Sequence, residues 1–268
     1  MSGLDFRTAT RVADAVAWLR EDPDAKLLAG GQTLLAAMRL RLAAPTLLID
    51  LQALPELKGL REDAGQLWVG AMCTHAQVAA SPLVRQRLPG LARLAAGIAD
   101  QQVRNRGTLG GSIANADPAA CWPAGVLALG GTVVTDRREI TADDFFQGLF
   151  STALEADEVL VGVRFPLAPR LHYLKFEQPA SRFALTGVAV ARTADGVRVA
   201  LTGLGHGVCR WPEAEAALAR RFDAQALNGL VVDAALASSD LHASAEYRAH
   251  LAGVLTRRAV QQHLISAP

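Results

Sequence analysis

The chain is poor in cysteine, and this excludes several kinds of site. Its three cysteines, Cys73, Cys121 and Cys209, are odd in number and lie far apart in the sequence. A disulfide framework or a four-cysteine metal site needs more of them at closer spacing, so we expect no iron–sulfur cluster in this chain. The six histidines likewise show no metalloprotease spacing, and we predict no metal site.

Net charge and long apolar runs are also lacking. The 27 basic and 26 acidic side chains leave a formal net charge of +1, which gives no electrostatic reason to expect nucleic acid or an anionic membrane as a partner. The apolar runs are interrupted well before the roughly 18 residues that a membrane span requires, and the N-terminus does not have the pattern of a signal peptide. We therefore expect a cytoplasmic globular protein.

Glycine is plentiful, and two of its adjacent pairs share a setting. Gly30-Gly31 lies within residues 28–34 and Gly110-Gly111 within residues 103–118. Apolar residues precede each pair, and polar side chains and a possible helix start follow it. Because glycine permits positive φ and close approach of a ligand, we expect the backbone N–H groups of both segments to face one phosphate. The pair Gly130-Gly131, before a β-branched run, is typical of an ordinary turn.

The distribution of apolar residues predicts an α+β fold with three units. A strand at 26–29, a helix through 34–42 and a strand at 46–50 would form a βαβ unit over residues 1–53. The first glycine pair then lies at the carboxyl end of a strand, where open α/β sheets bind ligands. In the second unit, residues 54–167, we expect strands at 67–71, 131–135 and 158–165 and helices at 88–99 and 119–129.

Pro166 and Pro169 mark the next boundary. Beyond it, in residues 168–268, the pattern predicts an antiparallel three-stranded sheet followed by three helices. The expected strands are 171–176, 185–192 and 197–205, and the expected helices are 212–221, 223–238 and 244–263.

Several of these segments resemble the FAD-binding medium subunits of molybdenum hydroxylases, a family that includes xanthine dehydrogenase and carbon monoxide dehydrogenase. The resemblance rests on Ala29-Gly30-Gly31-Gln32-Thr33-Leu34 and on residues 103–113, which fit Ile/Val-Arg-Asn-x-Gly-Thr-Leu-Gly-Gly-Ser/Asn-Ile. It continues through residues 115–119, 123–129 and 173–176, and so covers essentially the whole chain in family order. It implies a two-lobed FAD-binding domain of the vanillyl-alcohol-oxidase type, formed by the first two units, and a C-terminal flavoprotein domain.

The resemblance also implies which residues bind FAD. Two segments would hold the cofactor from opposite sides, Asn115 or Asp117 would bind ribityl or ribose hydroxyls, and Lys175 would reach the flavin. Ile98 and Leu160 would lie near the ring system, and Phe183 would cover the isoalloxazine. The expected cofactor-binding residues are Leu28, Ala29, Gly30, Gly31, Gln32, Thr33, Leu34, Ile98, Thr108, Gly110, Gly111, Ser112, Asn115, Asp117, Leu160, Lys175 and Phe183.

The implied function is electron transfer within a complex. A separate large molybdopterin-binding subunit would oxidise the substrate, and a separate small subunit would carry two 2Fe–2S clusters. This chain would pass the electrons through FAD to an external acceptor, in a dimer of heterotrimers. The substrate and the acceptor stay open at this point.

Two positions depart from the family pattern. Cys121 stands where many members have an aspartate that contacts the cofactor, and a thiol replaces a carboxylate acceptor poorly. Either Asp117 takes over that role or the flavin is held less tightly; a buried structural thiol is the interpretation we favour. Gln178-Pro179 replaces a basic pair that often follows the family lysine.

Three other functions are compatible with parts of this sequence. Gly110-Gly111-Ser112-Ile113-Ala114 approximates the nucleophile elbow of a hydrolase, but that motif ends in glycine and no acid or histidine stands at a telling spacing. A non-catalytic nucleotide-binding scaffold subunit and a stand-alone flavin oxidase also fit the glycine pairs. The colour of the purified complex and its need for partner subunits would separate these alternatives.

Overall fold

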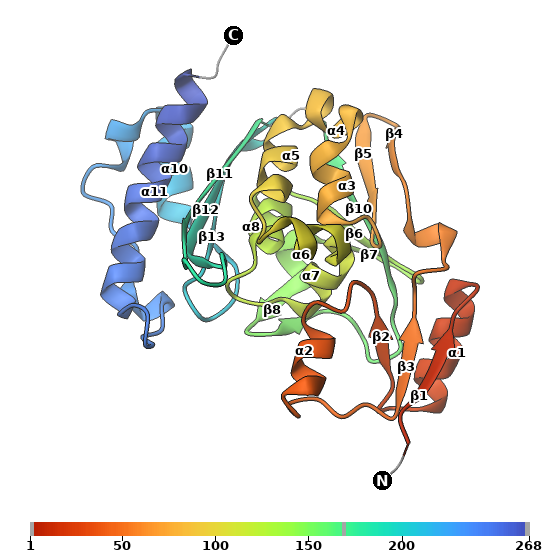
Figure 1. Ribbon diagram of the computed structural model, residues 1–268. Coiled ribbons are helices and arrows are strands. Elements are labelled where there is room, and N and C mark those ends of the chain that lie inside the picture. Colours follow the sequence, from red (N-terminus) through yellow and green to blue (C-terminus); the bar gives the residue numbers. More distant parts are fainter. Residues whose placement is uncertain (1–2, 168–169, 266–268) are drawn as a thin grey trace.

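The computed structural model describes residues 3–167 and 170–265. The expected boundary residue Pro169 lies outside these ranges, and Pro166 is the last residue of a strand. Figure 1 shows a small N-terminal sheet, a central sheet with its helices, and a C-terminal sheet backed by a long helix. Each of these parts has its own cluster of buried apolar side chains.

The N-terminal sheet is parallel and has the strand order β1-β3-β2. Its helix α1 buries Ala15 and Val16 against the strand residues Leu47 and Ile49. The first strand was not expected from the sequence, because Phe6 is exposed and its neighbours are polar. The elements are β1 (Asp5–Thr8), α1 (Val12–Glu21), β2 (Lys26–Leu28), α2 (Leu34–Arg39) and β3 (Leu47–Asp50).

The βαβ arrangement expected for this unit is present, with the first glycine pair directly after β2. Helix α2 ends at Arg39, earlier than expected, and Arg41 has a positive φ of 59°. Thr33 stands at the N-cap of α2, yet its side chain makes no capping hydrogen bond.

The central sheet is antiparallel, with the order β4-β5-β10-β6-β7. Strand β10 comes late in the sequence and lies in the middle, so it closes the unit. A short hairpin, β8–β9, follows helix α9. The elements are η1 (Pro55–Leu57), β4 (Leu60–Asp63), β5 (Gln66–Gly70), β6 (Thr132–Thr135), β7 (Glu139–Thr141), α9 (Ala142–Phe145), β8 (Phe146–Gly148), β9 (Ser151–Thr152) and β10 (Leu160–Pro166).

Six helices pack between the central and C-terminal sheets (Figure 1). The side chains of Thr74 and Ser81 cap two of them by accepting from the N–H groups of Gln77 and Val84. The helix expected at 88–99 ends at Ala96, and a further helix begins after Asp100, whose carboxylate accepts from the Val103 N–H. The helices are α3 (His75–Ala80), α4 (Pro82–Arg87), α5 (Pro89–Ala96), α6 (Gln101–Arg106), α7 (Leu109–Asn115) and α8 (Cys121–Ala128).

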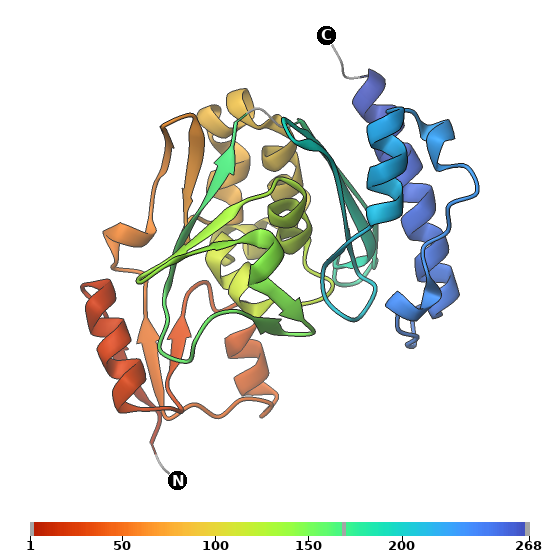
Figure 2. The same cartoon turned by 180° about the vertical axis from the view of Figure 1, so that it is seen from behind.

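The C-terminal sheet has four antiparallel strands, one more than the three expected. One face packs on α8, and α10 and α11 cover the other (Figures 1 and 2). The elements are β11 (Arg170–Glu177), β12 (Ala184–Thr193), β13 (Gly196–Thr202), β14 (Cys209–Arg210), α10 (Pro212–Arg220), η2 (Ala224–Leu227), η3 (Ala234–Leu236) and α11 (Ala245–Ile265).

The prediction of a helix at 223–238 is wrong. This segment holds only the short turns η2 and η3, because Gly229 has a φ of +80° and breaks the helical path. The carboxylates of Asp223 and Asp233 cap the two turns by accepting from the N–H groups of Gln225 and Ala235.

The C-terminal sheet is fixed to the segment that follows α7. The Pro118 carbonyl accepts from the Gly203 N–H at 2.6 Å and from the Thr202 hydroxyl at 2.8 Å, and that hydroxyl also lies 2.9 Å from the Ala120 carbonyl. The sheet therefore positions residues 117–121 from behind. Over residues 3–167 and 170–265, no helix combines the length and apolarity that crossing a membrane would require.

Candidate functional site

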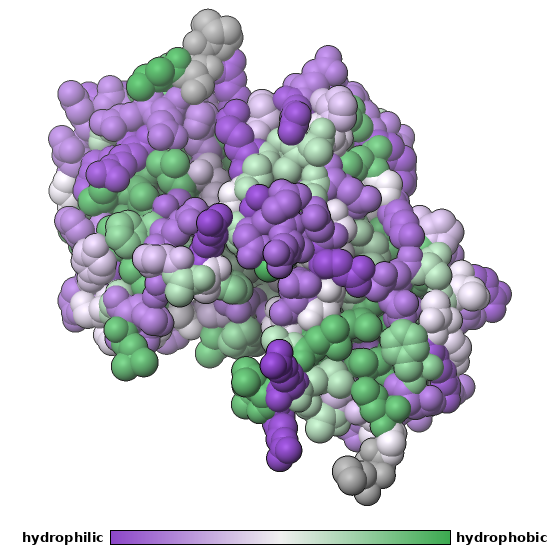
Figure 3. Space-filling view, viewed as in Figure 1, coloured by the Kyte–Doolittle hydropathy of each residue, from purple (hydrophilic) through white to green (hydrophobic). Residues whose placement is uncertain are grey.

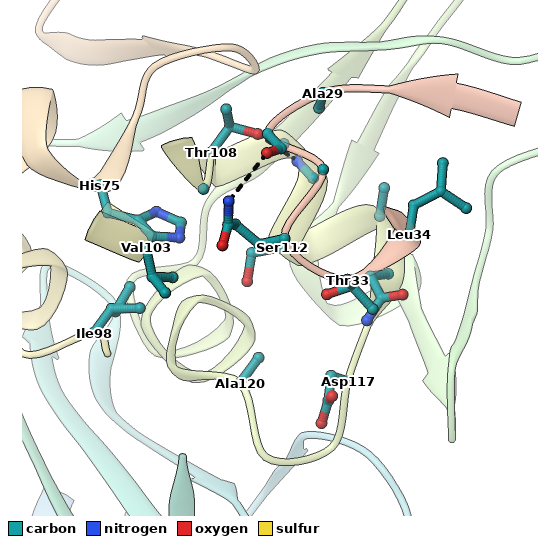
Figure 4. Close-up of a pocket in the computed structure, with 18 of the residues that line it drawn as sticks. Ala29, Thr33, Leu34, His75, Ile98, Val103, Thr108, Ser112, Asp117 and Ala120 are labelled. Atoms are coloured by element: carbon teal, nitrogen blue, oxygen red, sulfur yellow. Dashed lines mark hydrogen bonds between the residues drawn. The ribbon is translucent and has the colours of Figure 1, made fainter. Parts of the chain in front are cut away.

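A cavity of about 620 Å³ opens where the three parts of the chain meet. Both glycine segments line it, together with residues from the turn between α5 and α6, from α6 and β10, and from the loop after β11. Figure 4 shows His75, Ile98 and Val103 on one side, Thr33 and Leu34 on the other, and Asp117 and Ala120 beneath them. All of the predicted site residues except Leu28 and Lys175 line this cavity. Its volume is in the range of sites for small-molecule cofactors.

The two glycine segments touch each other through their backbones. Gly30 packs against the residues that lead into α7, so that a Cβ on it would overlap the Arg106 carbonyl oxygen and lie 2.9 Å from the Gly107 Cα. A Cβ on Gly111 would lie 3.5 Å from the Ala29 Cβ. Gly30 is therefore required for the contact between the segments, and this contact brings both of them to one cavity.

The first segment presents a row of unpaired backbone donors. Within the described ranges, the N–H groups of residues 30–34 donate to no protein acceptor. Gly31 has a φ of +72°, which turns the chain away from β2 and into α2. The side chain of Gln32 donates to the Gly30 carbonyl at 3.3 Å and closes the loop on itself. Consecutive free N–H groups of this kind suit an anionic phosphate.

The second segment differs from the sequence-based expectation. Gly110 and Gly111 lie in the first turn of α7, and their N–H groups already donate to the Ala71 carbonyl at 2.8 Å and the Thr108 hydroxyl at 3.0 Å. The N–H of Ser112 likewise donates to the Thr108 carbonyl. This segment therefore offers the cavity a glycine surface and side chains, and the expectation of free N–H groups from both segments is corrected.

After α7, the chain turns sharply and brings a carboxylate to the cavity. Ala116 has a φ of 46°, and Asp117 accepts from the Ala119 N–H at 2.8 Å through Oδ1. Burial raises the pKa of the Asp117 carboxyl. Oδ2 has no partner among the hydrogen bonds of the described residues, so Asp117 keeps an acceptor for a ligand hydroxyl. Asn115 also lines the cavity, from the last turn of α7.

Leu28 and Lys175, the two predicted residues that do not line the cavity, contact segments that do. Leu28 is buried, and its carbonyl accepts from the Leu51 N–H, which extends the N-terminal sheet. Lys175 donates to the Arg182 carbonyl at 2.6 Å and thereby holds the loop after β11. Phe183, in that loop, is 44% exposed and lines the cavity. Lys175 therefore contacts the loop that carries Phe183, and its contact with the flavin stays a prediction.

Sequence reasoning missed several lining residues. His75, Val103, Ala120, Phe150 and Glu158 come from elements that only the fold brings together. The buried Glu158 is paired with the Arg138 guanidinium at 2.6 Å, and this contact lowers the pKa of its carboxyl to about 2. One local signal for His75 was present in the sequence. Thr74 is a good helix cap, and a cap fixes the direction of the side chain that follows it.

His75 is held in one tautomer. Trp122, which can only donate, gives its Nε1–H to His75 Nδ1 at 2.9 Å, so the proton of the neutral imidazole is on Nε2. Burial and the nearby Arg104 cation lower the pKa of His75 to about 4. The ring is therefore neutral at pH 7.

Cys121 is buried at the cavity wall, and burial raises the pKa of its thiol. Its neighbours Lys175 and Tyr173 favour the thiolate, but the effect of burial is larger, so the pKa of the thiol is raised on balance. Ser112 lies inside α7, away from any strand-to-helix elbow, and it donates to no histidine in the parts described. The hydrolase alternative therefore has no geometric support. No cluster of metal-ligating side chains was found in the same ranges.

Known proteins match the whole chain. The family described as FAD binding domain in molybdopterin dehydrogenase matches residues 3–168, and the family described as CO dehydrogenase flavoprotein C-terminal domain matches residues 172–263. The nicotine 6-hydroxylase medium subunit of Paenarthrobacter nicotinovorans is 39% identical over 97% of each chain. The carbon monoxide dehydrogenase medium chain of Hydrogenophaga pseudoflava is 37% identical over 96% of each chain.

Solved structures agree with these matches. A chain of carbon monoxide dehydrogenase from Hydrogenophaga pseudoflava, in a form that lacks the Mo-pyranopterin moiety, superposes with a TM-score of 0.91. It is 36% identical, and the match covers 99% of this chain and 98% of that one. A chain of quinoline 2-oxidoreductase from Pseudomonas putida 86 gives a TM-score of 0.87 at 33% identity, covering 97% and 96%.

The contact at Gly30 can be tested by adding a single methyl group. In Gly30→Ala the new Cβ must push the Arg106 carbonyl away, so we expect a loss of about 1–3 kcal/mol in the free energy of unfolding. We also expect at least tenfold weaker FAD binding, measured by titration of the deflavinated protein. Gly97→Ala is the control, because its Cβ would meet nothing closer than 3.5 Å. Equal FAD affinity in both variants would contradict the proposed role of this contact.

The buried imidazole predicts a pH dependence of stability. Because the pKa of His75 is lowered to about 4 from 6.5, only the unfolded chain binds this proton between those pH values. The free energy of unfolding should therefore fall by about 3 kcal/mol from this group as the pH drops from 6.5 to 4. Urea unfolding of the wild type and of His75→Leu with Trp122→Phe should differ by an amount that shrinks over this range. A difference that stays constant with pH would show that the assignment is wrong.

Proposed function

The chain belongs to the FAD-binding medium subunits of the molybdenum hydroxylases, and from this premise we propose how it carries electrons. FAD lies in the cavity between the glycine segments and passes electrons from a small 2Fe–2S subunit to an external acceptor. The observation that carries this proposal is the row of free N–H groups at residues 30–34, held against the second segment at Gly30. These donors fit the pyrophosphate of a dinucleotide.

The rest of the cavity fits the two ends of the same cofactor. Much of the remaining lining is apolar, and it includes Ile98, Val103, Ala120, Leu160 and Phe183. We infer that the isoalloxazine binds beside Ile98, Leu160 and Phe183 and that the adenosine end of the cofactor occupies the rest of the cavity.

Each predicted residue then has a physical task. The N–H groups of residues 30–34 bind the pyrophosphate, and Thr33 and Ser112 add hydroxyl donors. Asp117, with one free carboxylate oxygen, and Asn115 bind ribityl or ribose hydroxyls. Thr108, Gly110 and Gly111 let the cofactor approach the backbone closely. Leu28 supports the loop after β2, and Lys175 supports the loop after β11. The bound flavin supplies the redox chemistry, and the chain binds it, orients it and limits its contact with water.

We further propose the assembly and organisation that the family implies. A large molybdopterin-binding subunit and a small 2Fe–2S subunit bind this chain, and two such heterotrimers pair in the cytoplasm. Exposed apolar side chains on and just after α2 suit a surface that a subunit covers, and Figure 3 shows apolar residues in this region. The exposed residues of this segment are Leu35, Leu40 and Leu42. Residues 1–53 and 54–167 form two lobes of the vanillyl-alcohol-oxidase type, and residues 168–268 form the C-terminal domain.

Purification from the source cell tests this function. We expect a large molybdopterin subunit and a small iron–sulfur subunit to co-purify with the tagged chain, in a yellow-brown complex that releases one FAD per chain in acid. In Gly111→Val, the branched side chain lies between Thr108 and Ala29, so the complex should assemble without FAD while the C-terminal domain stays folded. A colourless wild-type complex would favour a scaffold, turnover without partner subunits would favour a flavin oxidase, and full FAD in the variant would contradict the site.

A further inference from the structure

His75 is a buried polar side chain of the cavity, and one of its ring nitrogens has no protein partner among the described residues. The residue begins α3, and its backbone N–H donates to the Gly107 carbonyl at 2.9 Å, which ties it to the start of the second glycine segment. Its side chain is 5% exposed and lines the cavity, opposite Thr33 and Leu34 in Figure 4. Because both the helix start and the backbone bond are fixed, the direction of the imidazole is fixed as well.

The hydrogen bond from Trp122 decides which nitrogen can act. Trp122 is fully buried, and its Nε1–H occupies His75 Nδ1 at 2.9 Å. Nε2 therefore carries the proton, and over the described residues it donates to no protein acceptor. Nε2 has no protein partner, yet it is not fully enclosed by the protein. It therefore stays open to the cavity. The structure thus holds one neutral N–H donor ready for a ligand.

The surroundings of this donor select the kind of acceptor. Ile98 and Val103 lie beside the imidazole, so the adjacent part of the cavity suits an apolar part of a ligand (Figure 4). The pyrophosphate already has the free N–H groups of residues 30–34. A neutral donor among apolar side chains instead suits a carbonyl oxygen or nitrogen at the edge of an aromatic ring.

We propose that His75 Nε2–H donates a hydrogen bond to a polar atom of the isoalloxazine ring, and that Trp122 is the positioning residue that fixes this donor. The proposal rests on the FAD site proposed above. Hydrogen bonds to a charged acceptor are stronger than those to a neutral one. Because the ring gains negative charge when the flavin is reduced, the donor holds reduced FAD more tightly than oxidised FAD and raises its midpoint potential.

The test compares the affinity of the complex for the two redox states of FAD. His75→Leu combined with Trp122→Phe removes both partners of the buried bond, so no polar group is left unpaired in the core. In the assembled complex, we expect reduced FAD to lose about tenfold more affinity than oxidised FAD. For a two-electron couple this corresponds to a midpoint potential about 30 mV lower. Titration of the deflavinated complex with FAD and a redox titration of the flavin absorbance give both quantities.

Val103→Ala is the matched control, because it changes packing on the same wall without changing a donor. It should weaken both redox states equally and leave the midpoint potential unchanged. Trp122→Phe alone retains His75 and releases its tautomer, so it should lower the potential in the same direction by a smaller amount. This single variant decides the matter if the double variant does not assemble.

Two results would overturn the proposal. An unchanged midpoint potential in both Trp122 variants, with or without weaker FAD binding, would show that Nε2 meets a phosphate, a ribityl hydroxyl or no ligand. A wild-type complex that assembles but binds no FAD would instead remove the cofactor site itself, and with it the ground for this role of His75.

Discussion

The site depends on the backbone contact between Gly30 and residues 106–107. This contact joins the loop after β2, in the N-terminal unit, to the residues just before α7, in the central unit. A side chain of any size at Gly30 would meet main-chain atoms, which cannot move aside as a side chain can. The contact thus determines how far apart the two walls of the cavity lie, and the C-terminal sheet, bound to the Pro118 and Ala120 carbonyls, determines its floor.

The two glycine segments look alike in sequence, but they work differently. The first has free N–H groups because the chain has left β2 and α2 has only begun, so no carbonyl lies within reach of residues 30–34. In the second segment, the N–H groups of the first turn of α7 already donate hydrogen bonds to Ala71, Cys73 and Thr108. In the proposed site, the first segment therefore binds the pyrophosphate and the second shapes the space around it.

Much of this could be predicted from the sequence where a signal is local. Continuous buried runs gave β3 and α8 nearly at their observed bounds, and the glycine segments led to most of the cavity lining. The sequence failed where the cause is tertiary. Strand β1 has little apolar content. Residues 223–238 have a helical pattern, but Gly229 takes a positive φ. The hydrogen bond that fixes His75 comes from Trp122, 47 residues later. The four-stranded sheet likewise depends on β14, which has two residues.

The central claim is that the N–H groups of residues 30–34, and not those of residues 110–112, hold the pyrophosphate of FAD. Amide hydrogen exchange of the complex with and without FAD tests it most directly, because free and bonded N–H groups exchange at different rates. We predict that FAD slows exchange strongly at residues 30–34 and changes it little at residues 110–112. Unchanged exchange at residues 30–34, with FAD bound, would contradict this account.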